Sequence, residues 1–109
     1  MKIDLQRCYD SSDDFFLIGG SVVMKLSANA AIAVCERASQ HGLVIARIEG
    51  GIWHTPGFEA RLDCIWDGVE PPVDIGAAER NNLAAAEFIR SESEAHDVFV
   101  VTAPRLTGW

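Results

Sequence analysis

Alternation of apolar and polar residues is clearest over residues 58–66, where it predicts a β-strand. Successive side chains of a strand point to opposite faces, so one face carries the apolar residues Phe58, Ala60, Leu62, Cys64 and Trp66. Residues 43–54 predict a second strand, and the sequence Thr55-Pro56-Gly57 between the two is typical of a turn. The pair is therefore expected to form a hairpin.

Two segments carry apolar residues at helical spacing. Residues 28–40 follow Ser27, a good N-cap, and precede Gly42, which favours a left-handed stop. Residues 74–93 predict a second helix, with Asp74 as its cap. Each helix has one apolar stripe, so each is expected to cover a sheet with one face.

The other segments predict strands and turns. Residues 2–8 alternate as an edge strand, and residues 10–14 form a polar turn. Residues 15–18 and 21–26 are β-prone runs separated by Gly19-Gly20, which is either a bulge or a turn. Residues 98–102 are apolar on both faces, which indicates a central strand.

The order of these elements predicts an α+β fold in a single domain spanning residues 1–109. From residue 15 onward the order is β-α-β-β-α-β, a split βαβ pattern. We expect a ferredoxin-like sandwich, with two helices on one face of a mostly antiparallel sheet and an extra N-terminal strand. The shared core is expected to contain Ile32, Ile48, Leu62, Cys64 and Ile89.

Composition narrows the class of protein further. Sixteen acidic and nine basic residues give a net charge of −7, which disfavours nucleic acid and anionic membranes as partners and favours a basic protein. The longest uncharged runs are about ten residues, below the roughly 18 needed to cross a bilayer, and no signal peptide is evident. Three widely spaced cysteines, Cys8, Cys35 and Cys64, suit a reducing compartment. The expected location is cytoplasmic.

The outer face of the predicted hairpin is the candidate contact surface. It is expected to expose Trp53 among charged residues, because the helices cover only the other face. Trp and Arg are favoured anchors of protein interfaces, and the surrounding charges guide association. The predicted partner-binding residues are Trp53, Glu59, Arg61, Asp63, Asp67 and Glu70, with Arg47 and Glu49 on the same face. The alternative is a solvated face with cross-strand charge pairs.

No catalytic, cofactor or metal motif is recognisable, so we predict that the protein is not an enzyme and has no cofactor. His41, His54 and His96 fall at the ends of predicted elements, where a polar ring is ordinary. A Cys64/His54 pair can be imagined across the hairpin, but Cys64 is expected to belong to the core. The acidic clusters, including residues 10–14, lack the spacing of a calcium loop. No metal site is predicted.

Asn81-Asn82 is unusual within the second predicted helix, because Asn is a poor helix former that favours caps. Two interpretations stay open. Either the helix begins near Asn81, or an Asn amide binds backbone across an interface.

The segments 81–89, 96–102 and 58–66 together resemble small immunity proteins of bacterial polymorphic toxin and contact-dependent growth inhibition systems. The resemblance implies an antitoxin that binds one cognate toxin domain, often a nuclease, and occludes its active site or a nearby surface. It transfers no individual site residues. The alternative function is a small-molecule-binding module on a ferredoxin-like sheet, which a pocket lined by Trp53 and Trp66 would favour.

Overall fold

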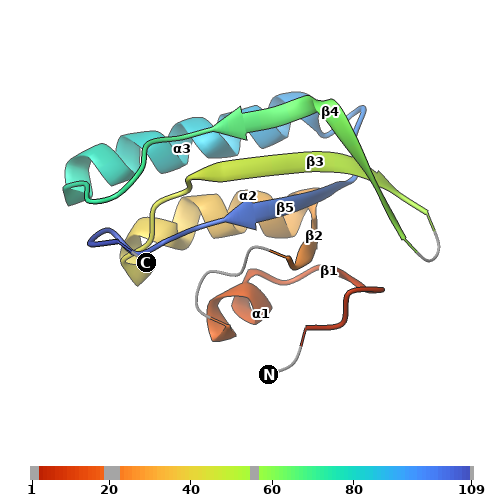
Figure 1. Ribbon diagram of the computed structural model, residues 1–109, viewed down its shortest axis with the longest axis horizontal. Coiled ribbons are helices and arrows are strands. Elements are labelled where there is room, and N and C mark those ends of the chain that lie inside the picture. Colours follow the sequence, from red (N-terminus) through yellow and green to blue (C-terminus); the bar gives the residue numbers. More distant parts are fainter. Residues whose placement is uncertain (1–2, 19–22, 55–56, 109) are drawn as a thin grey trace.

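The computed structural model describes residues 3–18, 23–54 and 57–108. This part of the chain forms three α-helices and a five-stranded sheet, arranged as Figure 1 shows. In chain order the elements are β1 (Cys8–Tyr9), α1 (Ser12–Leu17), β2 (Lys25–Ser27), α2 (Ala28–Arg37), the 3-10 helix η1 (Ala38–His41), β3 (Arg47–Trp53), β4 (Phe58–Asp67), α3 (Ile75–Glu92) and β5 (Val98–Thr102).

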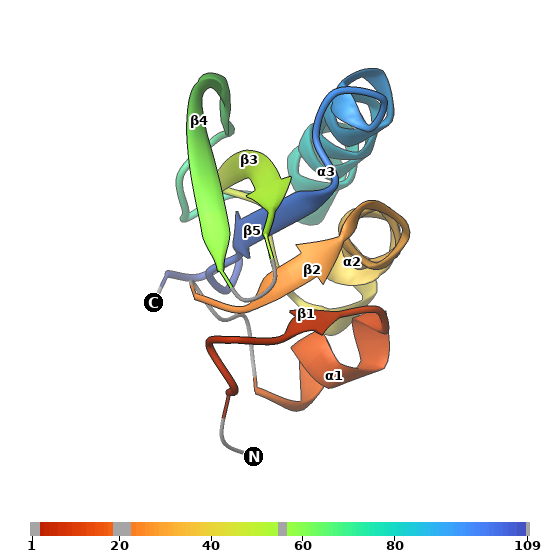
Figure 2. The same ribbon diagram turned by 90° about the vertical axis from the view of Figure 1, so that its right-hand side faces the viewer.

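The sheet has the strand order β1-β2-β5-β3-β4. Only the β1–β2 pair is parallel among the described strands, and the three α-helices lie on one side of the sheet (Figure 2). The α+β class and the single-sided helix layer are therefore confirmed. An N-terminal edge strand is present, but it consists of Cys8–Tyr9, so the prediction of a strand over residues 2–8 was wrong except at Cys8.

Both β-α-β units are split, as expected, but the ferredoxin-like order is not confirmed. Strand β5 separates β2 from β3, and β3 separates β4 from β5. A ferredoxin-like sheet would have the last strand at an edge. Here its residues Val98–Val101 are all buried, and a strand that is apolar on both faces needs neighbours and cover on both sides. This requirement places β5 at the centre, as its own pattern predicted.

Local capping explains where the helices begin. The side chain of Ser27 accepts a hydrogen bond from the Ala30 backbone N–H, and that of Asp74 accepts one from Ala77, so both predicted N-caps are confirmed. Gly42 adopts the expected left-handed conformation, with φ of 72°. Residues 15–18 were wrongly predicted as β, because Ser11 caps a short helix, α1, instead. Gly19, Gly20 and the Thr55-Pro56 turn lie outside the described residues.

Strand β4 contains a large bulge that changes which side chains are buried. Glu49 pairs with Ile65 and Gly51 with Ala60, so Gly50 alone stands opposite residues 61–64. Cys64 is buried as predicted, whereas Leu62 is 90% exposed. The prediction that Leu62 belongs to the core was wrong, because the extra residues break the strict alternation of the strand. Ile48 and Ile89 are buried and Ile32 packs against the core, as expected.

The predicted strand over residues 43–54 begins only at Arg47, because residues 43–45 enter the core without forming a ladder. Asn82 supplies two of their hydrogen bonds, whereas the Leu43 and Val44 N–H groups donate to the Ala38 and Pro104 carbonyls. The Asn82 side-chain oxygen accepts from the Ile45 N–H at 2.8 Å, and its amide nitrogen donates to the Leu43 carbonyl at 3.1 Å. Asn81 donates to the Ile45 carbonyl and accepts from the Val69 N–H.

Both asparagines lie inside α3, so they do not begin the helix. The second interpretation, an amide that binds backbone, is the one observed, and the backbone belongs to the same chain. Gly68 fits this arrangement, since a Cβ there would lie 2.2 Å from the Ile45 carbonyl oxygen.

We expect Asn82→Ala to lower the free energy of unfolding by about 3 kcal/mol, because it leaves a buried N–H and a buried C=O without partners. Asn29→Ala is the matched control, since Asn29 is exposed on α2, and should change stability by less than about 0.5 kcal/mol. Urea denaturation measures both. Equal stability of the two variants would contradict the role of Asn82.

We expect Leu62→Ala to change the free energy of unfolding by less than about 0.5 kcal/mol, because the side chain is already in water. Ile89→Ala, at a fully buried position of α3, should cost about 2–5 kcal/mol. Denaturant unfolding of the two variants measures these free energies and so tests whether the Leu62 side chain is exposed. A large loss in Leu62→Ala would mean that this side chain is packed.

Candidate functional site

The predicted contact residues do not form one face, because the bulge divides them into two groups. Arg47 and Asp67 are paired across the hairpin, and the Arg47 Nη1 lies 2.7 Å from the Asp67 Oδ1. The Arg47 Nε also lies 3.4 Å from the Glu49 carboxylate. This group lies on the outer face of the sheet, where Glu49 and Val100 are paired across β3 and β5.

The second group lies farther along β4, toward the hairpin turn. Glu59 is 2.8 Å from both the His54 imidazole and the Arg61 guanidinium. Asp63 lies nearest to His96, at 3.9 Å, beyond the C-terminal end of α3. Glu59 is paired with Ile52, on the face opposite Trp53 and Phe58, and Asp63 approaches His96, so this group lies toward the helix side of the hairpin arm.

Trp53 is half-buried and pairs with Phe58 across the hairpin. Its backbone N–H donates to the Asp97 carboxylate at 2.8 Å. The ammonium group of Lys25 lies 5.9 Å from the centre of the Phe58 ring, so this end of the hairpin bends over β2 on the outer face. Trp53 is therefore part of the outer group, apart from Asp63.

Leu62 is the contact candidate that the sequence did not reveal. It is the most exposed of the large apolar residues described, and it lies between Arg61 and Asp63 on the bulge. Its side chain is in water while charged groups stand on both sides, which is the composition of an interface anchor with a polar rim. The sequence did not reveal it, because the regular alternation over residues 58–66 placed Leu62 on the apolar face that was expected to be buried.

Asp67 and Glu70 extend the acidic surface beyond β4. Both are exposed, and Glu70 borders a small cavity of about 190 Å³ with Ala46, Pro71 and Pro104. Asp63 is also highly exposed, with 85% of its side chain accessible. These three carboxylates keep most of their negative potential available to a partner, because an exposed ion pair such as Asp67 with Arg47 neutralises it only in part.

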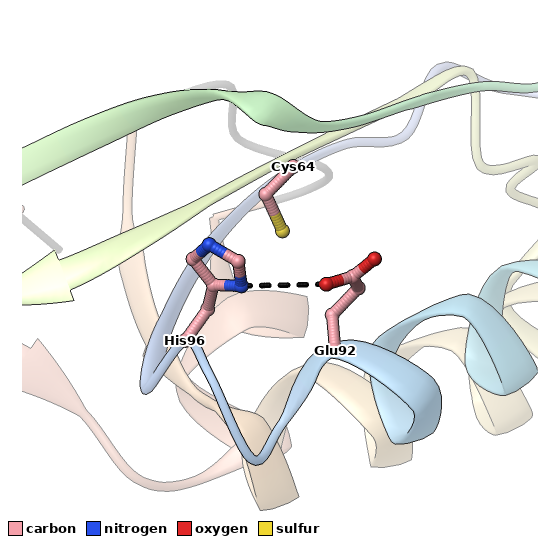
Figure 3. Close-up of side chains that lie close together, drawn as sticks. All are labelled: Cys64, Glu92 and His96. Atoms are coloured by element: carbon pink, nitrogen blue, oxygen red, sulfur yellow. Dashed lines mark ion pairs between the residues drawn. The ribbon is translucent and has the colours of Figure 1, made fainter.

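A further group of polar side chains lies where the bulge meets the end of α3. Figure 3 shows Cys64, Glu92 and His96 pointing toward one another, and one potential ligand atom from each lies within 4.8 Å of the others. Cys64 does not pair with His54, since Cys64 faces His96 and His54 contacts Glu59. The i, i+4 spacing of Glu92 and His96 is the sequence signal that could have indicated this group.

The pKa of Cys64 is not that of an activated nucleophile. Burial, assisted by the negative charges of Glu92 and Asp63, raises the pKa of the Cys64 thiol to about 11. A nucleophilic cysteine needs a lowered pKa, so that the thiolate is present at neutral pH. At neutral pH, Cys64 is therefore a protonated thiol.

The cavities do not favour the small-molecule alternative. An open cavity of about 500 Å³ is bordered by Phe16, His41 and Arg105, and the Phe16 and His41 rings stack at 3.7 Å. Neither Trp53 nor Trp66 lines this cavity or two smaller ones of about 320 and 190 Å³. Among the described residues, no helix is both long and apolar enough to cross a membrane.

The small α+β domain exposes Leu62 among charged residues on its hairpin, which is the composition of a surface that binds another protein. Comparison with known proteins gives the family. The family model described as "Colicin-E5 Imm protein" matches residues 24–103. The chain therefore belongs to the colicin E5 immunity protein family.

Individual relatives agree with this assignment. The chain is 84% identical, over the full length of both proteins, to "Immunity protein CdiI" of Burkholderia pseudomallei. It is 38% identical over 80 residues to "Colicin-E5 immunity protein" of Escherichia coli, which covers 72% of this chain and 96% of that protein. "Colicin-E5 immunity protein in ColE9", also from Escherichia coli, is equally similar. The predicted resemblance to immunity proteins is confirmed.

Proposed function

We propose that this protein is the antitoxin of a toxin–immunity pair and that it neutralises one cognate toxin domain by binding it. The observation that carries the proposal is the 84% identity, over the full length of both proteins, to an immunity protein named CdiI. At this level of identity the fold and most of the surface are shared. The partner is thus a protein, and the exposed hairpin is a surface suited to bind it.

The toxin in this proposal is a basic nuclease domain. The support is electrostatic, since a protein with net charge −7 repels nucleic acid and attracts a cationic protein. A nuclease needs cationic groups to hold phosphates, and those groups are complementary to exposed carboxylates. Inhibition follows when the immunity protein covers the active site or a surface that the substrate must cross.

The proposed contact surface combines the predicted residues Trp53, Glu59, Arg61, Asp63, Asp67 and Glu70 with Leu62. Asp63, Asp67 and Glu70 supply long-range attraction. Leu62 and Trp53 supply apolar area, which keeps a complex together once water has been expelled. The two groups lie on opposite sides of the β3–β4 hairpin and the loop that follows it, so a partner reaches both by gripping the hairpin from its two sides.

The protein acts without turnover and in the cytoplasm in this proposal. Cys64 is protonated, and His54 is already paired with Glu59. All three cysteines are free thiols, which suits a reducing compartment.

We expect charge reversal in Asp63→Lys and Asp67→Lys to slow association with the toxin domain, measured by stopped-flow or surface-based kinetics. The effect should be largest near 0.01 M salt, where the Debye length is about 30 Å, and small at 0.15 M, where it is about 8 Å. Glu79→Lys is the matched control, because it changes net charge equally at an exposed position on α3. It should slow association less than either hairpin variant.

We expect Leu62→Ala and Trp53→Ala to act mainly on dissociation, raising its rate by about 30-fold if each is an anchor worth roughly 2 kcal/mol. Circular dichroism verifies that each variant is folded. If the hairpin variants bind the toxin as the parent does at every salt concentration, the contact surface lies elsewhere. It is then sought first around residues 10–14, or on the exposed side of α3 if Glu79→Lys alone slows association.

We also expect the purified protein to show no hydrolytic turnover of RNA, DNA or ester substrates above a buffer blank. Activity that copurifies with the folded protein and disappears in Cys64→Ala would contradict a purely binding role.

A further inference from the structure

We propose that Cys64, Glu92 and His96 form a zinc site that connects the β4 bulge to the C-terminal end of α3. The inference is independent of the toxin, because it rests on the geometry and chemistry of these side chains alone. Cys64 comes from the bulge, Glu92 from the last residue of α3 and His96 from the turn before β5. Figure 3 shows the three side chains converging on one small space.

Their spacing suits a small tetrahedral ion. Zinc bonds of about 2.0–2.2 Å to nitrogen and oxygen place two such ligand atoms roughly 3.3–3.5 Å apart. The His96 Nδ1 lies 3.4 Å from the Glu92 Oε2, and the ligand atoms of all three residues lie within 4.8 Å of one another. A side-chain adjustment of about 1 Å at Cys64 completes three sides of a tetrahedron.

The His96 imidazole gives a second, independent observation. His96 is only 8% exposed, and its Nδ1 has no hydrogen-bond partner among the described residues. The 3.4 Å separation from Glu92 brings opposite charges close if the ring is protonated, but it does not form a hydrogen bond. A buried polar atom without a partner is costly. A zinc ion bound at Nδ1 removes that cost.

Asp63 and Gly50 surround the proposed site on the sides of His96 and Cys64. The Asp63 carboxylate lies 3.9 Å from the His96 Nε2, which is too long for a hydrogen bond but adds negative charge beside a cation at this site. Gly50 leaves room for the sulfur, because a Cβ at that position would lie 2.3 Å from the Cys64 Sγ. The sulfur therefore occupies a space that any other residue at position 50 would fill.

The ligand types select the metal. A cysteine sulfur and a histidine nitrogen favour zinc over magnesium or calcium, which prefer oxygen. Three protein ligands leave the fourth position for water, and the Glu92 side chain, 30% exposed, marks the route to solvent. Binding requires the Cys64 thiol to release its proton to the buffer. The bound ion then joins two elements that are otherwise held by packing.

The test uses the full chain without an affinity tag, freed of metal with a chelator. Titration with zinc alone, against a competing colorimetric chelator, should give one site per chain. Cobalt should give a thiolate-to-cobalt charge-transfer absorption, which reports the sulfur ligand directly. Glu92→Gln should weaken zinc binding at least tenfold, because it replaces a charged ligand by a neutral one.

Cys64→Ser should abolish the charge-transfer absorption, whereas Cys8→Ser, at a cysteine outside the cluster, should preserve it. If Cys64→Ser does not fold, Glu92→Gln decides, since that side chain is partly exposed. The proposal is overturned if the parent protein does not bind zinc at micromolar concentration. It is equally overturned if cobalt shows no sulfur absorption or if Glu92→Gln binds zinc as the parent does.

Discussion

The hydrogen bonds from Asn81 and Asn82 to the chain at residues 43–45 hold the two layers of this protein together. That segment crosses the core between η1 and β3. Its Leu43 and Val44 N–H groups donate to the Ala38 and Pro104 carbonyls, but the Ile45 N–H and the Leu43 and Ile45 carbonyls need other partners. The asparagines provide them from the middle of α3. Through Val69, Asn81 also fixes the chain just after β4. The helix, the start of β3 and the end of β4 are thus placed relative to one another by two amide side chains.

The bulge in β4 is the second constraint, and it separates surface from core over a few residues. Four residues on β4 stand opposite Gly50, so the strand bows outward and Leu62 and Asp63 project into water. Cys64, directly after them, turns inward toward Glu92 and His96. The proposed contact surface and the proposed zinc site therefore both depend on the β4 bulge, which supplies Leu62 and Asp63 to the first and Cys64 to the second. A change in the length of the bulge would alter both.

The sequence predicted what depends on local interactions. Ser27, Asp74 and Gly42 mark helix boundaries through their own side chains or backbone, so α2 and α3 were found close to their observed ends. The central position of β5 followed from its apolar faces. The exposure of Leu62 and the meeting of Cys64 with His96 could not be predicted, because a bulge depends on the partner strand and leaves little trace in one strand's pattern. The capping of α1 by Ser11 was readable, but the apolar run from Phe15 concealed it.

The central place of β5 also determines when this domain can fold. Strands β2 and β3 are both paired with β5 and not with each other, yet β5 follows every other strand in the chain. On the ribosome, the sheet therefore lacks its middle until residues 98–102 have emerged, whereas the β3–β4 hairpin can already form. Contacts between strands far apart in sequence slow folding. An immunity protein of this architecture consequently becomes able to bind its partner only after nearly the whole domain has been synthesised.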